Sequence, residues 1–285
     1  MLTYLGYRFV EFLAFILPYP IAYFVARSGF MLIFKLGISV DYIKKNASIV
    51  MKKDIDDPLV HSTTRKVYEN WSHNVVDFLK HRTVSRKRLR QRIKLEGTHN
   101  LDKALKKKKG VVIFTCHIGN FEWGACRLAV DGYDIRGVSL VRKSELTNKF
   151  FEQRRLTKGL KTLYINRMLN VFRYLDDNEI VAIPSDWDPK GRAERTFDFF
   201  GRKANLPTGA LQIALKSGAA LIPSFIWREG KYDHHQVIGA PIDLDRTGDK
   251  EEMLQKNIKK VLPVMEKYIS EHIDEWELFH NIWVD

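Results

Sequence analysis

From Gly110 onward, the chain alternates between short apolar segments of strand length and segments whose apolar residues recur at helical spacing. Because such segments pack as layers, the alternation predicts an α/β fold with a mixed central sheet. A long helix is expected at 253–272, with a kink at Pro263. The expected strands are 111–116, 135–141, 162–165, 180–184 and 219–227, and the expected helices are 120–130, 145–158, 169–177 and 208–217.

The apolar N-terminal segment indicates whether the chain associates with a membrane. Residues 12–26 carry no charge and lie between Glu11 and Arg27. A spanning helix needs about 20 apolar residues, and Pro18 and Pro20 interrupt helical hydrogen bonding in this run. We therefore expect a bent pair of helices that forms a membrane anchor in the interface. Two alternatives stay open: a buried pair of core helices, or a single span that buries Arg27.

We accordingly divide the chain into a membrane-associating segment, 1–40, and an α/β domain, 41–285. Residues 41–81 are expected to form two further helices, the second with amphipathic spacing. The two cysteines, Cys116 and Cys126, are too few for a disulfide framework and suit a reducing compartment.

The formal net charge of +13 favours anionic partners. Seven cations fall within residues 82–94, and four lysines follow at 106–109. Such runs are usually solvated faces, but beside an apolar N-terminus they favour an anionic membrane surface. A nucleic-acid-binding protein would also explain the charge. It would not explain the apolar N-terminus, and the sequence contains no nucleic-acid-binding motif, so we expect no nucleic acid.

The chemistry is concentrated where the strand at 111–116 ends. His117 follows the strand, Gly119 and Asn120 supply turn and N-cap chemistry, and Glu122 lies in the first turn of the next helix. A carboxylate on one imidazole nitrogen would leave the other free to take a proton from a hydroxyl group. Although a lone histidine at a strand end is more often structural, this context favours His117 and Glu122 as a catalytic pair.

The segment from His117 to Glu122, His-Ile-Gly-Asn-Phe-Glu, resembles the H-x4-D/E motif of the glycerolipid acyltransferase superfamily. More narrowly, it resembles the lipid A biosynthesis acyltransferases, the late lauroyl and myristoyl transferases. The resemblance extends over most of the chain. Trp187 departs from it, because the family carries glutamine there. Further matching segments are Val141-Arg142-Lys143, Asn166-Arg167, Ile183 to Asp188, Phe199 to Ala204, Pro207 to Ala210, Leu215 to Pro223 and Glu275 to His280.

The resemblance implies an O-acyltransferase on the cytoplasmic face of the bacterial inner membrane, monotopic or single-pass. Its donor would be an acyl thioester of acyl carrier protein or coenzyme A. Its acceptor would be a membrane glycolipid, either a lipid A precursor or another glycolipid or phospholipid. His117 would deprotonate the acceptor hydroxyl and Glu122 would orient the imidazole, with no covalent intermediate and no cofactor. A noncatalytic lipid-binding protein of this fold is the remaining alternative.

Four further residues are expected at the substrate. Arg142 is expected to bind a phosphate or to support the oxyanion, and Arg167 and Asn120 are placed with the substrate-binding residues. Asp186 is expected to hold Arg142 or Arg167 in place. No His, Cys or carboxylate set has zinc spacing, so we expect no metal. Residues expected in the core instead are Cys116, Phe197, Phe199 and Phe200, and Thr208 and Gly209 are expected to shape a helix N-terminus.

Overall fold

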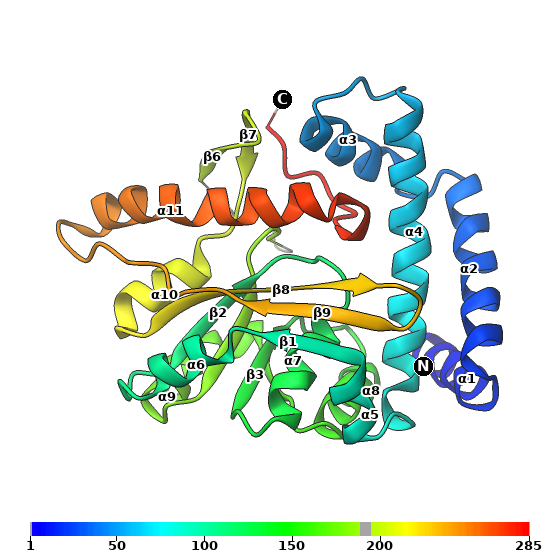
Figure 1. Ribbon diagram of the computed structural model, residues 1–285, viewed down its shortest axis with the longest axis horizontal. Helices are drawn as coiled ribbons and strands as arrows, with labels where there is room; N and C mark the ends of the chain where they lie inside the picture. Colours follow the sequence, from blue (N-terminus) through cyan, green and yellow to red (C-terminus); the bar gives the residue numbers. More distant parts are fainter. Residues whose placement is uncertain (1, 189–194, 285) are drawn as a thin grey trace.

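The computed structural model describes residues 2–188 and 195–284 and is built around a mixed sheet (Figure 1). Seven strands lie in the order β1-β9-β8-β2-β5-β3-β4, and every neighbouring pair is parallel except β8 with β9. A separate antiparallel pair, β6 and β7, stands beside this sheet. The strands are β1 (Ile93–Glu96), β2 (Val111–Thr115), β3 (Ile135–Ser139), β4 (Lys161–Tyr164), β5 (Ile180–Pro184), β6 (Thr196–Phe199), β7 (Arg202–Asn205), β8 (Ala220–Glu229) and β9 (Asp233–Ile238).

Helices cover both faces of the sheet, as the alternating pattern predicts. The α-helices are α1 (Leu2–Ile16), α2 (Tyr19–Lys35), α3 (Val40–Met51), α4 (Pro58–Leu79), α5 (Arg86–Arg92), α6 (Thr98–Leu105), α7 (Phe121–Val130), α8 (Glu145–Leu156), α9 (Val171–Asp176), α10 (Gly209–Ser217) and α11 (Lys250–Glu271). The shorter 3₁₀ helices are η1 (Lys80–Arg82), η2 (Ile165–Asn170) and η3 (Ile273–Glu275). Helix α11 continues through Pro263, where we expected a kink.

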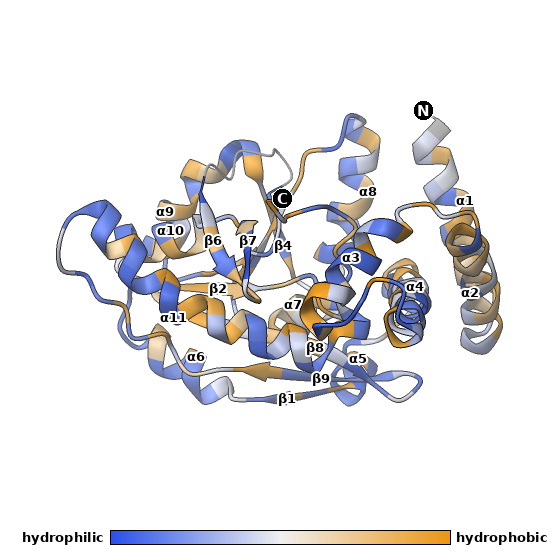
Figure 2. Cartoon of the chain, turned by 90° about the horizontal axis from the view of Figure 1, so that it is seen from above, coloured by the Kyte–Doolittle hydropathy of each residue, from blue (hydrophilic) through white to orange (hydrophobic). Residues whose placement is uncertain are grey.

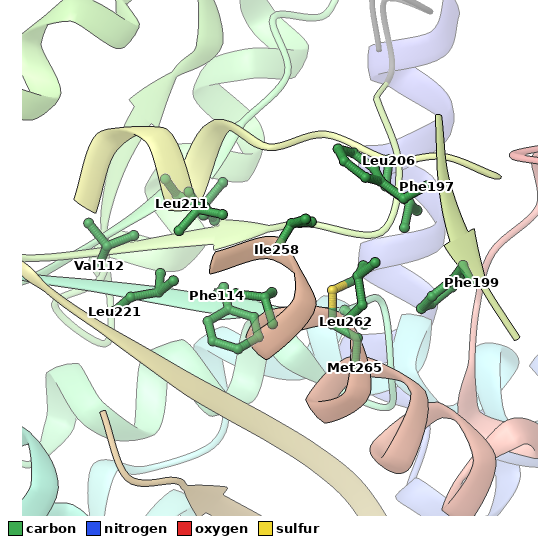
Figure 3. Packing of buried hydrophobic residues seen from close by; sticks show 14 of the residues in the cluster. Val112, Phe114, Phe197, Phe199, Leu206, Leu211, Leu221, Ile258, Leu262 and Met265 are labelled. Atoms are coloured by element: carbon green, nitrogen blue, oxygen red, sulfur yellow. The ribbon is translucent and has the colours of Figure 1, made fainter. Parts of the chain in front are cut away.

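The central strand β2 is buried on both faces, and its side chains divide between two cores. Val112 and Phe114 belong to the core that packs against α10 and α11, which Figure 3 shows from close by. Val111 and Ile113 belong to the opposite core, beneath α5, α6 and α7. Successive strand residues point to opposite faces, so a strand with two covered faces reads as an unbroken apolar run.

The N-terminal helices form a layer at one end of the sheet, where α2 packs along α4 (Figure 1). The chain bends between α1 and α2 at Leu17 and Pro18, which confirms the predicted bent pair. Within the described residues, no helix by itself has the length and apolar composition of a membrane span. Helices α2 and α3 meet that criterion jointly, but only across an 87° bend.

The five strands expected from the alternating pattern are all present, and four more accompany them. The expected helices between those strands correspond to α7, α8, α9 and α10. The basic run at 82–94, which we treated as a charged surface only, is folded: it forms α5 and leads into the edge strand β1. Its cations nevertheless remain largely exposed, while Leu89 and Ile93 are buried in the core beneath.

Candidate active site

His117 lies in the turn between β2 and α7, at the carboxyl end of the central strand. Gly119 makes this turn possible: its φ is +56°, and a Cβ there would lie 2.4 Å from the carbonyl oxygen of Ile226. The C-terminal segment fixes the turn from outside, because the Glu277 amide donates to the His117 carbonyl over 2.7 Å. The Gly119 amide likewise donates to the Glu275 carbonyl over 2.9 Å.

The Asp186 carboxylate contacts both the side chain and the backbone amide of His117. The distance from His117 Nδ1 to Asp186 Oδ1 is 2.7 Å, and the His117 amide donates to Oδ2 over 2.8 Å. Trp276 Nε1 donates to the same Oδ2 over 2.9 Å, and Asp186 is fully buried. A carboxylate accepts only, so Nδ1 carries the proton of the neutral imidazole and Nε2 is left as the base.

The electrostatics of this pair favour a charged imidazole. Burial by itself lowers the pKa of His117, but the adjacent Asp186 carboxylate outweighs burial and raises that pKa above its ordinary value. Burial raises the pKa of Asp186 in turn, yet its contacts with His117 hold that pKa below the usual range. The arrangement can therefore accept a proton on Nε2 and stabilise the resulting imidazolium.

The expected contact between Glu122 and His117 is wrong. Glu122, in the first turn of α7, is paired with Arg155 of α8: Arg155 Nε donates to Glu122 Oε2 over 2.9 Å, and Nη2 donates to Oε1. Arg155 outweighs the effect of burial and lowers the pKa of Glu122. Glu122 thus acts on His117 only through its charge, which further favours the imidazolium.

The expectation that Asp186 holds Arg142 or Arg167 is also wrong, and the sheet explains why. Strands β2 and β5 are parallel neighbours, with Thr115 beside Pro184. Because His117 and Asp186 each lie two residues beyond these partners, the register brings the two side chains together at one edge of the sheet. The pair is 69 residues apart in the sequence.

A cavity of about 330 Å³ opens beside His117. Most of its lining is apolar, from β3, η2, β5 and α10, and its polar side includes Glu122, Arg142 and Arg155. Phe121 packs edge-on against the His117 ring with the centroids 5.1 Å apart. An apolar hollow with a general base and cations at one side suits a ligand that has a hydrocarbon chain and a polar reacting group.

Arg142 is the predicted substrate residue whose surroundings most resemble a ligand site. Its guanidinium lies over the Phe151 ring at 3.7 Å, and its buried Nη1 finds no hydrogen-bond partner among residues 2–188 and 195–284. Burial and the neighbouring Arg155 both lower the pKa of Arg142. An unpaired cation that lines the cavity would be satisfied by an anionic or carbonyl oxygen of a ligand.

Two other expected substrate residues lie elsewhere. Asn120 is buried and caps α7, accepting from the Trp123 amide over 3.1 Å, and so it has a structural contact. Arg167 is exposed on η2 and does not line the cavity. Thr208 and Gly209 begin α10 as expected. Core positions are confirmed for Cys116, Phe197 and Phe199, with Phe200 packed against them.

Sequence reasoning missed two features of the site. Arg155 was not considered, since an arginine inside an amphipathic helix gives no sign of being buried. Trp187 lines the cavity and stacks on His280 with the ring centroids 3.8 Å apart and the planes 5° from parallel. The C-terminal segment that carries Trp276 and His280 resembles the family in sequence, but nothing local in it indicates its contacts with Asp186 and Trp187.

Sequence comparison identifies the chain as an acyltransferase. The chain matches the family described as bacterial lipid A biosynthesis acyltransferase over residues 1–284, and it belongs to that family. It is 25% identical over 256 residues to the phosphatidylinositol mannoside acyltransferase of Mycobacterium tuberculosis, covering 86% of this chain and 77% of the relative. The Mycolicibacterium smegmatis protein of the same name is 23% identical, covering 67% of this chain and 64% of the relative.

Among solved structures, the chain is similar to the 1-acyl-sn-glycerophosphate acyltransferase of Thermotoga maritima, with 13% identity and a TM-score of 0.41. This likeness covers 87% of the present chain and 97% of the other.

Proposed function

We propose that this acyltransferase moves a fatty acyl group from a thioester donor to a hydroxyl group of a membrane glycolipid. The observation that carries the proposal is the contact of His117 with the buried Asp186, which leaves the imidazole in the lining of an apolar cavity. Nε2 of His117 removes the hydroxyl proton as the oxygen attacks the thioester carbonyl. The tetrahedral intermediate then expels the thiolate, which takes the proton from the imidazolium, so no covalent acyl-enzyme forms.

We infer that Arg142 supports this reaction. Its unpaired guanidinium would bind the tetrahedral oxyanion or a phosphate of the substrate. Glu122 pairs with the neighbouring Arg155 and neutralises its charge. Arg142 is therefore the cation that remains available to the ligand. The buried Cys116 is not used: burial raises its pKa well above the ordinary value, and a protonated thiol is a poor nucleophile.

For the acceptor, we propose a glycolipid, with a lipid A precursor as the first choice. The family description refers to lipid A, and two relatives are named for phosphatidylinositol mannoside. Both names refer to glycosylated lipids, which supports a glycolipid as the acceptor. The donor would be acyl carrier protein or coenzyme A. The exposed cations of α5 suit an acidic carrier protein, which they would attract before binding.

We further propose that the chain works on the cytoplasmic face of the inner membrane as a monotopic protein. Large apolar side chains are exposed along α1 and α2, which Figure 2 shows as strongly hydrophobic. Exposed apolar side chains along two successive helices favour insertion into the lipid interface. These residues are Leu5, Phe9, Val10, Phe12, Phe15, Ile16, Ile21, Phe24, Val25 and Leu32.

The direct test compares membrane lipids from cells that express the wild-type chain with those from cells that express His117→Ala at the same level. The proposal expects a glycolipid heavier by one acyl group in the first sample alone, detected by mass spectrometry. If the added acyl group were found on a phospholipid instead, the proposed acceptor would be wrong but the proposed reaction would stand. Equal lipid profiles with an active control enzyme would reject the proposed function.

A further inference from the structure

A second hollow, separate from the catalytic cavity, lies between α1 and η1. It has a volume of about 480 Å³, and its lining residues are Arg8, Glu11, Phe12, Phe15, Leu79, Arg82 and Thr83. None of them lines the cavity beside His117. We propose that this α1–η1 groove binds one anionic phospholipid of the surrounding membrane. The inference does not depend on the reaction proposed above.

The charge of the α1–η1 groove is unbalanced. Glu11 is buried and accepts from Nε and Nη2 of Arg154, whose own side chain is only 1% exposed. Arg8 shares the same carboxylate more distantly, at 3.7 Å, and Arg82 has no ion-pair partner among the described residues. Arg154 and Arg8 therefore share one carboxylate, and Arg82 adds a further positive charge to the lining of the groove. A phosphodiester would supply the missing negative charge through the charge-assisted, often bidentate, bonds that arginine forms with phosphate.

The remaining lining selects a lipid over a free anion. Phe12 and Phe15 are 58% and 66% exposed on α1, and Leu79 lies buried behind them. Further large apolar side chains are exposed along α1 and α2, where acyl chains of a membrane would lie. An anionic headgroup on the arginines and an acyl chain along the phenyl rings would satisfy both parts of the groove. An acidic protein would leave the phenyl rings without a matching contact.

The groove is also joined to the catalytic cavity through α8. Arg154 holds Glu11 of α1, and the next residue, Arg155, holds Glu122 beside His117. Tyr7 of α1 packs against Phe150 and Phe151 of the same helix. A lipid in the α1–η1 groove would therefore bind next to the contacts that dock α1 on the enzyme.

The experiment measures saturable binding of dispersed dioctanoyl phosphatidylglycerol to the full-length protein in neutral detergent, by titration calorimetry. Two groove variants, Arg82→Gln and Phe15→Ala, are compared with matched controls: Arg88→Gln removes an exposed arginine of α5, and Phe24→Ala removes an exposed ring of α2. We expect Arg82→Gln to raise the Kd about fivefold, since one cation near a lipid phosphate is lost. Phe15→Ala should raise it several-fold, and both controls should leave it unchanged.

Four results would overturn the proposal. Equal Kd values for Arg82→Gln and Arg88→Gln would mean that the lipid responds to the overall positive charge of the protein and not to the groove. Equally tight binding of dioctanoyl phosphatidylcholine would remove the need for an anion, and equally tight binding of glycerol phosphate would indicate a free-phosphate site. A loss seen in Arg142→Gln instead would place the lipid in the catalytic cavity. His117→Ala should bind as the wild type does, so failure here is distinguishable from failure of the proposed reaction.

Discussion

Asp186→Asn is the substitution whose consequence follows most directly from the geometry. The two groups that donate to Oδ2, the His117 amide and Trp276 Nε1, can still donate to the asparagine oxygen. The amide nitrogen must then face His117 Nδ1, where the carboxylate oxygen had been at 2.7 Å. Since that nitrogen donates, Nδ1 must become the acceptor and the ring proton moves to Nε2. The base is lost although the residue size and most contacts are retained.

The magnitude combines two losses, the wrong tautomer and the missing charge beside the imidazolium. General-base catalysis contributes about 10²- to 10⁴-fold, and the equivalent Asp-to-Asn exchange in a serine protease triad costs about 10⁴-fold. We therefore expect kcat to fall about 10³- to 10⁴-fold, which corresponds to about 4–5.5 kcal/mol in the barrier. Substrate binding should change little, because Asp186 is fully buried behind the histidine.

The assay is single-turnover acyl transfer from a radiolabelled thioester donor to purified acceptor lipid, with protein integrity checked by circular dichroism. Asp176→Asn, an exposed aspartate on the remote helix α9, is the matched control and should behave as the wild type. A folded Asp186→Asn enzyme with a rate within tenfold of the wild type would refute the assignment of Asp186 as the partner of His117.

Four other predictions follow from the site and the N-terminal helices. Because Asp186 raises the pKa of His117, kcat/KM should decrease with falling pH at a higher pH than for an ordinary histidine. In Asp186→Asn, this decrease should occur at a lower pH than in the wild type. The raised pKa of His117 also implies that its pairing with Asp186 stabilises the folded protein at low pH. This stabilisation should be lost as the pH rises through the folded-state pKa of His117. Urea denaturation at a series of pH values across that range would measure the loss. Glu122→Gln should destabilise the protein by about 3 kcal/mol, measured as unfolding in urea, because the largely buried Arg155 loses its counter-charge; an unchanged midpoint would contradict that role. Replacing the exposed Phe24 by Ser should reduce sedimentation with anionic vesicles while the protein stays folded, and undiminished sedimentation would argue against contact of α2 with lipid.

The elements around the site could be predicted from the sequence because local patterns determine them. The apolar run of β2 is continuous because both faces of the strand are covered, and Asn120 caps the following helix by a contact three residues away. Pro18 likewise ends one helix and begins the next, so the bend near it was visible in the sequence. The strand β9 was missed because polar residues such as His234 and Gln236 interrupt its apolar pattern, although both are buried.

The partners inside the site could not be predicted, because they depend on strand order and register. Nothing local indicates that β5 lies beside β2, and that neighbour relation is what brings Asp186 to His117. Glu122 is closer to His117 in sequence, so it was the natural candidate. The turn directs its side chain to α8 instead, where Arg155 supplies a buried opposite charge. Sequence distance therefore favoured the wrong carboxylate for the histidine.

The central claim is that His117 is the base that activates the acceptor hydroxyl. The most direct measurement is the acyl-transfer rate of purified His117→Ala beside wild-type protein, at saturating donor and acceptor and with matched vesicle binding. The proposed mechanism predicts a loss of about 10³-fold or more with fold and membrane association unchanged, because Nε2 of His117 is the proton acceptor. A folded, vesicle-bound His117→Ala enzyme that turns over at a near-normal rate would contradict it.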